Sequence, residues 1–137
     1  MENEMADYAV KTIDDMEAVY GGAFKRARAE LGVESFGLQV LDFPPNADAY
    51  PEHDHAEDGQ EEVYVILSGS GEVEIDGERH PLGVGTMARV SPGTTRKLRT
   101  GAEPMRVLAI GGCPGKVYEA PEISQLGVPD PLAQPQG

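Results

Sequence analysis

The sequence predicts an all-β domain, a closed barrel or a sandwich, carrying a short helical extension at its N-terminus. From residue 35 onward, apolar and polar residues alternate over short runs, which is the period-two pattern of half-buried strands. Glycine and proline separate these runs, and no helical period recurs after residue 34. The length of 137 residues fits one domain with a sizeable core.

Residues 1–34 are expected to form the helical extension, packed as structural cover on a barrel of residues 35–117. Thr12 is an N-cap candidate, and apolar residues then recur at helical spacing at Ile13, Met16, Val19 and Tyr20. The glycine pair at 21–22 should weaken or break this helix, and a second piece over residues 23–32 should end at Gly32, giving two short helices or one kinked helix.

Strands are expected at residues 36–40, 63–67, 73–75, 87–90, 97–99 and 105–110. Asp76 and Gly77 predict a tight hairpin, residues 44–46 a turn, and the Gly-rich residues 68–71 a reversal of the chain. The proline-rich tail, residues 118–137, should run along the surface or lack fixed structure.

The formal net charge of −13 argues against nucleic acid or anionic membrane as a partner, because both need basic patches. No apolar run is long enough for a transmembrane helix, and the acidic N-terminus does not resemble a signal peptide. The single cysteine, Cys113, excludes an intrachain disulfide and fits a reducing cytoplasm, where we expect the protein. A phosphate-binding loop and paired zinc-type cysteines are absent, which disfavours nucleotide and hydrolase classes.

Two of the three histidines, His53 and His55, lie two residues apart, followed by an acidic cluster that ends at Glu62. Residues i and i+2 of an extended chain face the same side, so both imidazoles can aim at one point. A carboxylate from a neighbouring strand would complete a partial metal-binding set. The third histidine, His80, follows the predicted hairpin and is expected at the surface.

Residues 51–77, PEHDHAEDGQEEVYVILSGSGEVEIDG, resemble the first signature motif of the cupin superfamily, in particular its small single-domain, type-2 conserved-barrel proteins. That motif runs His-x-His, a short gap, Glu, six residues and Gly; His53, His55, Glu62 and Gly69 match it. The gap before the glutamate is longer than usual, with six residues in place of three or four.

The second cupin motif resembles GTMARVSPGTTRKL through Gly85, Pro92 and Gly93. Its fourth ligand, a histidine in the family, is Arg96 here, and a guanidinium cannot coordinate a metal. Upstream of the first motif, Asn46 or Ala47 stands where the family has a glycine, and Asn tolerates a left-handed turn better than most residues.

The resemblance implies a double-stranded β-helix, or jelly-roll, barrel that is commonly dimeric, so we expect a homodimer. It also implies one divalent metal at the barrel mouth, Fe, Mn, Ni or Zn, held by His53, His55 and Glu62. Tyr64 shares the strand parity of Glu62, and Tyr64, Tyr50 and Met87 are expected to line the interior as substrate-binding residues.

Arg96 leaves two alternatives open. In the first, three ligands hold the metal, Arg96 binds a small anionic metabolite from the open side, and the protein is a dioxygenase or an isomerase. In the second, Arg96 takes the place of the metal beside Glu62, and the protein is a metal-free, non-catalytic binding module. The sequence identifies no catalytic residue.

Overall fold

The computed structural model describes residues 7–133, which fold into two packed antiparallel sheets. The strands are β1 Ala18–Val19, β2 Phe24–Lys25, β3 Gly37–Phe43, β4 Glu61–Ile75, β5 Glu78–Gly83, β6 Met87–Val90, β7 Arg96–Arg99 and β8 Met105–Gly112. One α-helix, α1, spans Ala27–Leu31, and 3-10 turns lie at Ile13–Asp15, Glu122–Ser124 and Pro131–Ala133. No helix in this part of the chain is long and apolar enough to cross a membrane.

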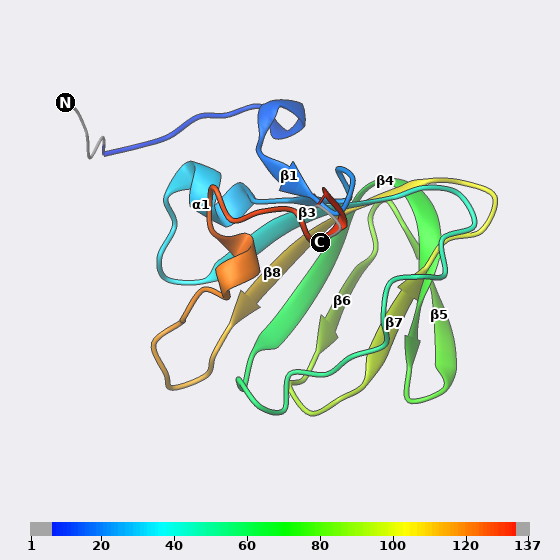
Figure 1. The fold of residues 1–137 in the computed structure, drawn as a ribbon. Helices are drawn as coiled ribbons and strands as arrows, with labels where there is room; N and C mark the ends of the chain where they lie inside the picture. Colours follow the sequence, from blue (N-terminus) through cyan, green and yellow to red (C-terminus); the bar gives the residue numbers. More distant parts are fainter. Residues whose placement is uncertain (1–6, 134–137) are drawn as a thin grey trace.

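The long strand β4 belongs to both sheets. Its first half pairs with β8 and β6. This sheet continues from β8 to β3, then β2 and finally β1. The second half of β4 pairs with β5 and β7 and forms the other sheet. Figure 1 shows β5 and β7 beside this second half, away from β3 and β8. The main core lies between the sheets and includes Leu41, Tyr64, Val73, Leu98 and Val107. This is the predicted all-β jelly-roll barrel.

The expectation that residues 68–71 reverse the chain is wrong. The strand continues through them, with a bulge between Ile66 and Ser68. Gly69 has a φ of +76°, and a Cβ there would collide with the carbonyl oxygen of Pro104. The glycines therefore let β4 bend from one sheet into the other while neighbouring backbone approaches closely.

The two other turn signals are confirmed. Asp76 and Gly77, with φ of +50° and +86°, join β4 to β5 with Ile75 opposite Glu78. Asn46 has a φ of +58°, so the predicted turn over residues 44–46 contains a left-handed residue, which Asn tolerates.

The helix predicted to begin at Thr12 is wrong: only a 3-10 turn forms at Ile13–Asp15, and β1 and β2 follow as a hairpin. Tyr20, Gly21 and Gly22 take positive φ values in its turn, a conformation that consecutive glycines favour over a helix. Phe24 pairs with Leu41 of β3, so sheet pairing overrides the helical spacing. The second piece, α1, is shorter than predicted but ends at Gly32, whose φ is +80°.

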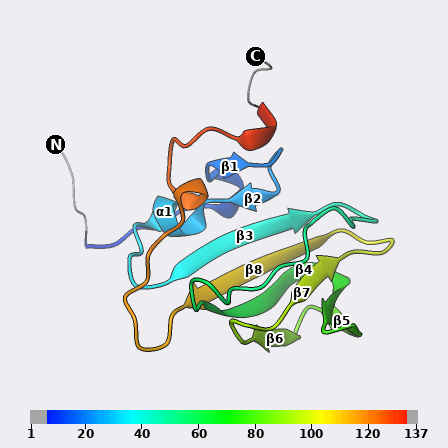
Figure 2. The same cartoon turned by 60° about the horizontal axis from the view of Figure 1, so that its bottom comes forward.

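The N-terminal elements and the C-terminal tail pack together on one side of the barrel (Figure 2). Met16 and Ala27 bury Val40 on the outer face of β3. Buried Arg26 pairs with Glu17, and its Nε donates to the carbonyl oxygen of Ile123 in the tail at 2.8 Å. The tail to residue 133 thus has fixed structure; the expectation for residues 134–137 lies outside the described residues.

Candidate metal centre

His53 and His55 lie on the segment that leads from β3 into β4 and crosses the second sheet. Main-chain bonds hold this segment: His53 N donates to Arg96 O and Arg96 N donates to His53 O, both at 2.9 Å. His55 N donates to Pro92 O at 2.7 Å. Three backbone hydrogen bonds therefore fix both histidines against the β6–β7 side of the barrel.

His53, His55 and Glu62 converge on one point: a ligand atom of each lies within 4.8 Å of the other two. The Nε2 atoms of His53 and His55 are 3.8 and 3.3 Å from Glu62 Oε1. Ligand atoms each bound about 2.1 Å from one ion are about 3.0 to 3.4 Å apart at bond angles from square to tetrahedral. The spacing suits three ligands of a single ion after small movements.

Both imidazoles are held through their far nitrogens. His53 Nδ1 lies 3.2 Å from the carbonyl oxygen of Pro51, and His55 Nδ1 lies 3.1 Å from Asp58 Oδ2. These oxygens can only accept, so in a neutral imidazole they favour a proton on Nδ1 and a lone pair on Nε2. His55 Nε2 is buried and has no hydrogen-bond partner among the described residues. An unpaired buried lone pair beside a carboxylate fits a metal ligand.

Glu62 is the charged centre of the site, with a side chain 13% exposed. Burial by itself would raise the pKa of Glu62, but contacts with His53, His55 and Tyr64 outweigh it and hold the pKa well below its ordinary value. The Tyr64 hydroxyl donates to Glu62 Oε1 at 2.7 Å. In turn, the Glu62 carboxylate is the main cause that raises the pKa of His55, against the effect of burial. The carboxylate is therefore ionised and available as a ligand.

Arg96 is fully buried and does not line the cavity beside the site. Its Nη1 lies 3.5 Å from Glu62 Oε1, and its Nη2 donates to Ser91 O at 2.9 Å. Arg96 therefore lies buried beside Glu62 and not on the open side of the cavity, and its role in anion binding stays a prediction. The physical reason for this burial is the pairing of Arg96 with His53 across the backbone, which directs the guanidinium into the barrel.

Of the other predicted residues, Tyr64 is 1% exposed and lies in the interior as expected, but it does not line the cavity, so its role in substrate binding stays a prediction. Tyr50 lines the cavity, its ring in edge contact with Phe43 and His53 at centroid distances of 5.4 and 5.8 Å. The expectation for Met87 is wrong: this side chain is 67% exposed on the outer face of β6, because its neighbours of opposite parity face the core. His80 is exposed, as predicted.

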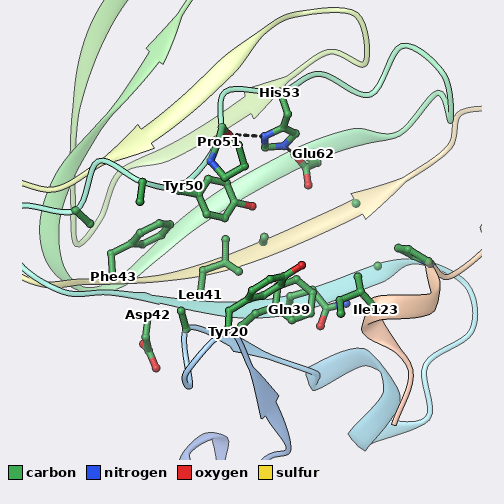
Figure 3. Close-up of a pocket in the computed structure, with 18 of the residues that line it drawn as sticks. Tyr20, Gln39, Leu41, Asp42, Phe43, Tyr50, Pro51, His53, Glu62 and Ile123 are labelled. Atoms are coloured by element: carbon green, nitrogen blue, oxygen red, sulfur yellow. Dashed lines mark hydrogen bonds and ion pairs between the residues drawn. The ribbon is translucent and has the colours of Figure 1, made fainter. Parts of the chain in front are cut away.

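A cavity of about 810 Å³ opens beside His53 and Glu62, between the 44–55 segment and β3 (Figure 3). In Figure 3 the hydroxyl of Tyr50 points into the space between this segment and Leu41. Burial raises the pKa of Tyr50 to about 12, so its phenol stays protonated and can donate at neutral pH.

The sequence reasoning missed two residues that support the site. Asp58 orients His55 through its contact with Nδ1. Gln60 is 9% exposed and packs where Gly111 lacks a side chain, since a Cβ there would collide with the Gln60 amide. The sequence signal that could have indicated Asp58 and Gln60 is the long gap between His55 and Glu62. Asp58 and Gly59 within this gap favour a turn that folds back on His55.

In a comparison with protein-family models, the model of the Cupin domain matches residues 39–111, more than half of the chain. The chain belongs to the cupin family. The matched region contains all three candidate ligands and Arg96. No curated protein matches this chain.

Solved structures agree on the fold of this cupin. A cupin protein from Bacteroides fragilis has a TM-score of 0.67 at 24% identity and covers 91% of this chain and 99% of its own. A predicted oxalate decarboxylase from Thermotoga maritima has a TM-score of 0.51 at 23% identity, covering 56% of this chain and 65% of its own. A Cupin 2 conserved barrel domain protein from Salinispora arenicola has a TM-score of 0.51 at 22% identity, covering 57% and 63%. At these identities the likeness shows the fold alone.

Proposed function

We propose that this cupin is a metal-dependent protein whose barrel holds one divalent ion through His53 Nε2, His55 Nε2 and the carboxylate of Glu62. The observation that carries the proposal is the buried, unpartnered Nε2 of His55, 3.3 Å from an ionised carboxylate, with its Nδ1 held by Asp58. An imidazole with one nitrogen anchored and the other free is the usual arrangement of a metal-ligating histidine.

A three-ligand set beside a cavity suits an enzyme, because positions remain for a small molecule. When bound, the ion would supply Lewis-acid chemistry for an isomerase or lyase, or oxygenase chemistry in the case of iron. The chain's own residues would position the reaction. Tyr50 can donate a hydrogen bond to a molecule in the cavity, and Tyr64 keeps Glu62 oriented by its hydroxyl.

Metal content tests the proposal. Purified protein would be stripped, reconstituted anaerobically with Fe²⁺ and aerobically with Mn²⁺, Ni²⁺ or Zn²⁺, and analysed by mass spectrometry for bound metal. One equivalent per chain is expected, lost in His53→Ala and His55→Ala but kept in His80→Ala, whose imidazole is exposed. Protein that retains no ion under any condition, or equal loss in His80→Ala, would refute the proposal.

A second candidate is a metal-free binding module, and the Arg96–Glu62 ion pair favours it. With Nη1 of Arg96 3.5 Å from the carboxylate, a cation already stands near the position of a fourth ligand. In that case the native protein should bind no metal, and Arg96→Met should lose stability. One equivalent of metal held by the native protein would exclude this alternative.

A further inference from the structure

We propose that the cavity binds an uncharged, largely apolar small molecule rather than an anionic metabolite. This rests on the proposed function in one respect: the polar end of the molecule would lie at His53 and Glu62. The inference itself concerns the wall of the cavity, which can be tested with or without a metal.

The wall contains no lysine or arginine within the described residues, so no permanently charged cation in it can pair with an anionic body. It is instead rich in rings and aliphatic side chains: Tyr20, Phe24, Phe43, Tyr50, Ile123 and Leu132. A cavity of about 810 Å³ is in the range that encloses a drug-sized ligand.

The acidic residues of the wall do not favour a cation either, because each is already paired. Asp42 Oδ1 accepts from Arg106 Nε at 2.7 Å, and its side chain points away from the cavity in Figure 3. Asp48 Oδ1 accepts from Arg99 Nε at 2.7 Å. With Glu62 held by the histidines and Arg96, the cavity offers no free charge of either sign.

Part of this wall is built by segments outside the region that the cupin family model matches. Tyr20 and Phe24 come from the β1–β2 hairpin, and Ile123 and Leu132 from the tail. These segments are tied together: Tyr20 N donates to Asp130 Oδ1 at 2.9 Å, and Gly127 N donates to Glu17 Oε2 at 2.7 Å. The apolar wall is thus a fixed part of this chain added to the common barrel.

A polar donor lies at the inner end. The Tyr50 hydroxyl reaches into the cavity beside His53 and can donate a hydrogen bond there. The matching ligand has a ring or an aliphatic body and a single hydrogen-bond acceptor at the end that meets the site. A neutral aromatic or alicyclic carbonyl compound or alcohol has this form.

The test uses two dyes that differ in a sulfonate: neutral N-phenyl-1-naphthylamine and anionic 8-anilinonaphthalene-1-sulfonate. Each is titrated by fluorescence into the full protein, metal-stripped and metal-reconstituted. We expect saturable binding of one neutral dye per chain and at least tenfold weaker binding of the sulfonate. Equal or tighter binding of the sulfonate, or no binding of the neutral dye, would overturn the inference. The inference would also be overturned if the neutral dye bound only after dilution had separated a dimer into monomers. That result would mean that a second copy of the chain fills the cavity.

A charge added to the wall locates the dye. Ile123→Lys should weaken binding of the neutral dye and tighten binding of the sulfonate dye at least tenfold. Leu126→Lys, on the same segment but outside the wall, should leave the affinity for both dyes unchanged. Leu132→Lys, 71% exposed in the native chain, repeats the test should Ile123→Lys not fold. Identical dye binding in all variants would place the dye elsewhere and refute the inference.

Metal analysis of the same samples separates the two proposals. Neutral-dye binding in protein that takes up no metal would leave this inference standing and refute the metal centre. Metal uptake without neutral-dye binding would do the reverse.

Discussion

Glu62 and Arg96 form an ion pair inside the barrel, with Nη1 of the fully buried arginine 3.5 Å from Oε1 of the carboxylate. A fixed positive charge therefore stands beside the carboxylate of the candidate metal centre. This charge both compensates Glu62 and competes with any cation held by it. Stability and metal affinity should therefore respond to Arg96 in opposite directions.

Arg96→Met should lower the free energy of unfolding of metal-free protein by about 3 kcal/mol, because a buried carboxylate loses its partner. The same change should tighten Zn²⁺ binding at least about tenfold, because a nearby cation is removed. Urea unfolding and calorimetric titration measure the two effects. Arg89→Met, which breaks an exposed pair with Glu61, is the control and should leave both unchanged within error. Weaker zinc binding by Arg96→Met would contradict the prediction.

Tyr64→Phe should lower the free energy of unfolding by about 1–3 kcal/mol, since a buried charged acceptor loses a hydrogen bond of 2.7 Å. Chemical denaturation measures the loss. Tyr8→Phe, at a tyrosine that is 79% exposed, serves as the matched control with no expected change. Equal stability of Tyr64→Phe and the native protein would show that this hydroxyl does not support Glu62.

Asp58→Ala should weaken metal binding about 10–100-fold while leaving the fold intact, because the histidine loses the acceptor that orients its ring. The measurement is competition for Zn²⁺ with a chromophoric chelator. Glu57→Ala removes an exposed carboxylate from the same turn and should have little effect. If both variants bind metal equally well, Asp58 has no role in positioning His55.

Gly69→Ala should destabilise the barrel far more than Gly77→Ala. Both glycines have positive φ, at +76° and +86°, so backbone strain of about 1–2 kcal/mol is common to both. Only at Gly69 would the new Cβ meet backbone, the carbonyl of Pro104. The difference between their midpoints in urea isolates the close approach. Equal midpoints would mean that β4 can shift without cost.

Asp42→Asn should destabilise the protein at neutral pH, with the difference from the native chain shrinking as pH falls below about 4. Burial by itself would raise the pKa of Asp42, but Arg106 and Lys25 hold it below its ordinary value. A group with a lowered folded pKa stabilises above its unfolded pKa, and this contribution is lost on acidification. Urea titrations between pH 6 and 3 measure the difference.

Asp15→Asn, an exposed carboxylate in the neighbouring 3-10 turn, is the control for this pH series. A gap between Asp42→Asn and the native chain that stays constant down to pH 3 would contradict the assignment.

The barrel strands could be predicted from short-range periodicity, and the candidate ligand trio from the spacing of the two histidines together with the resemblance to the cupin motif, which supplied Glu62. Alternation along β4 placed Glu62 and Tyr64 on the inner face, and the two-residue spacing of His53 and His55 placed their rings together. The hairpin at Asp76 is likewise a property of two adjacent residues.

The prediction of a helix near Thr12 was wrong because helical periodicity takes no account of a partner strand that can pair with the same residues. Val19 and Phe24 form β-strands since the edge of β3 is available to pair with them, which no local pattern records. The error at residues 68–71 has the same origin. Glycine is needed there because backbone at the end of β7 and the start of β8 approaches closely, and not because the chain turns.

The sequence by itself determined the barrel and the convergence of His53, His55 and Glu62. Tertiary structure alone decided that Arg96 is buried against Glu62, that Asp58 orients His55, and that the cavity has an uncharged wall. The physical reason is the range of the contacts involved. Strand parity acts over two residues, whereas the wall depends on groups such as Tyr20 and Asp130, which are 110 residues apart in the chain.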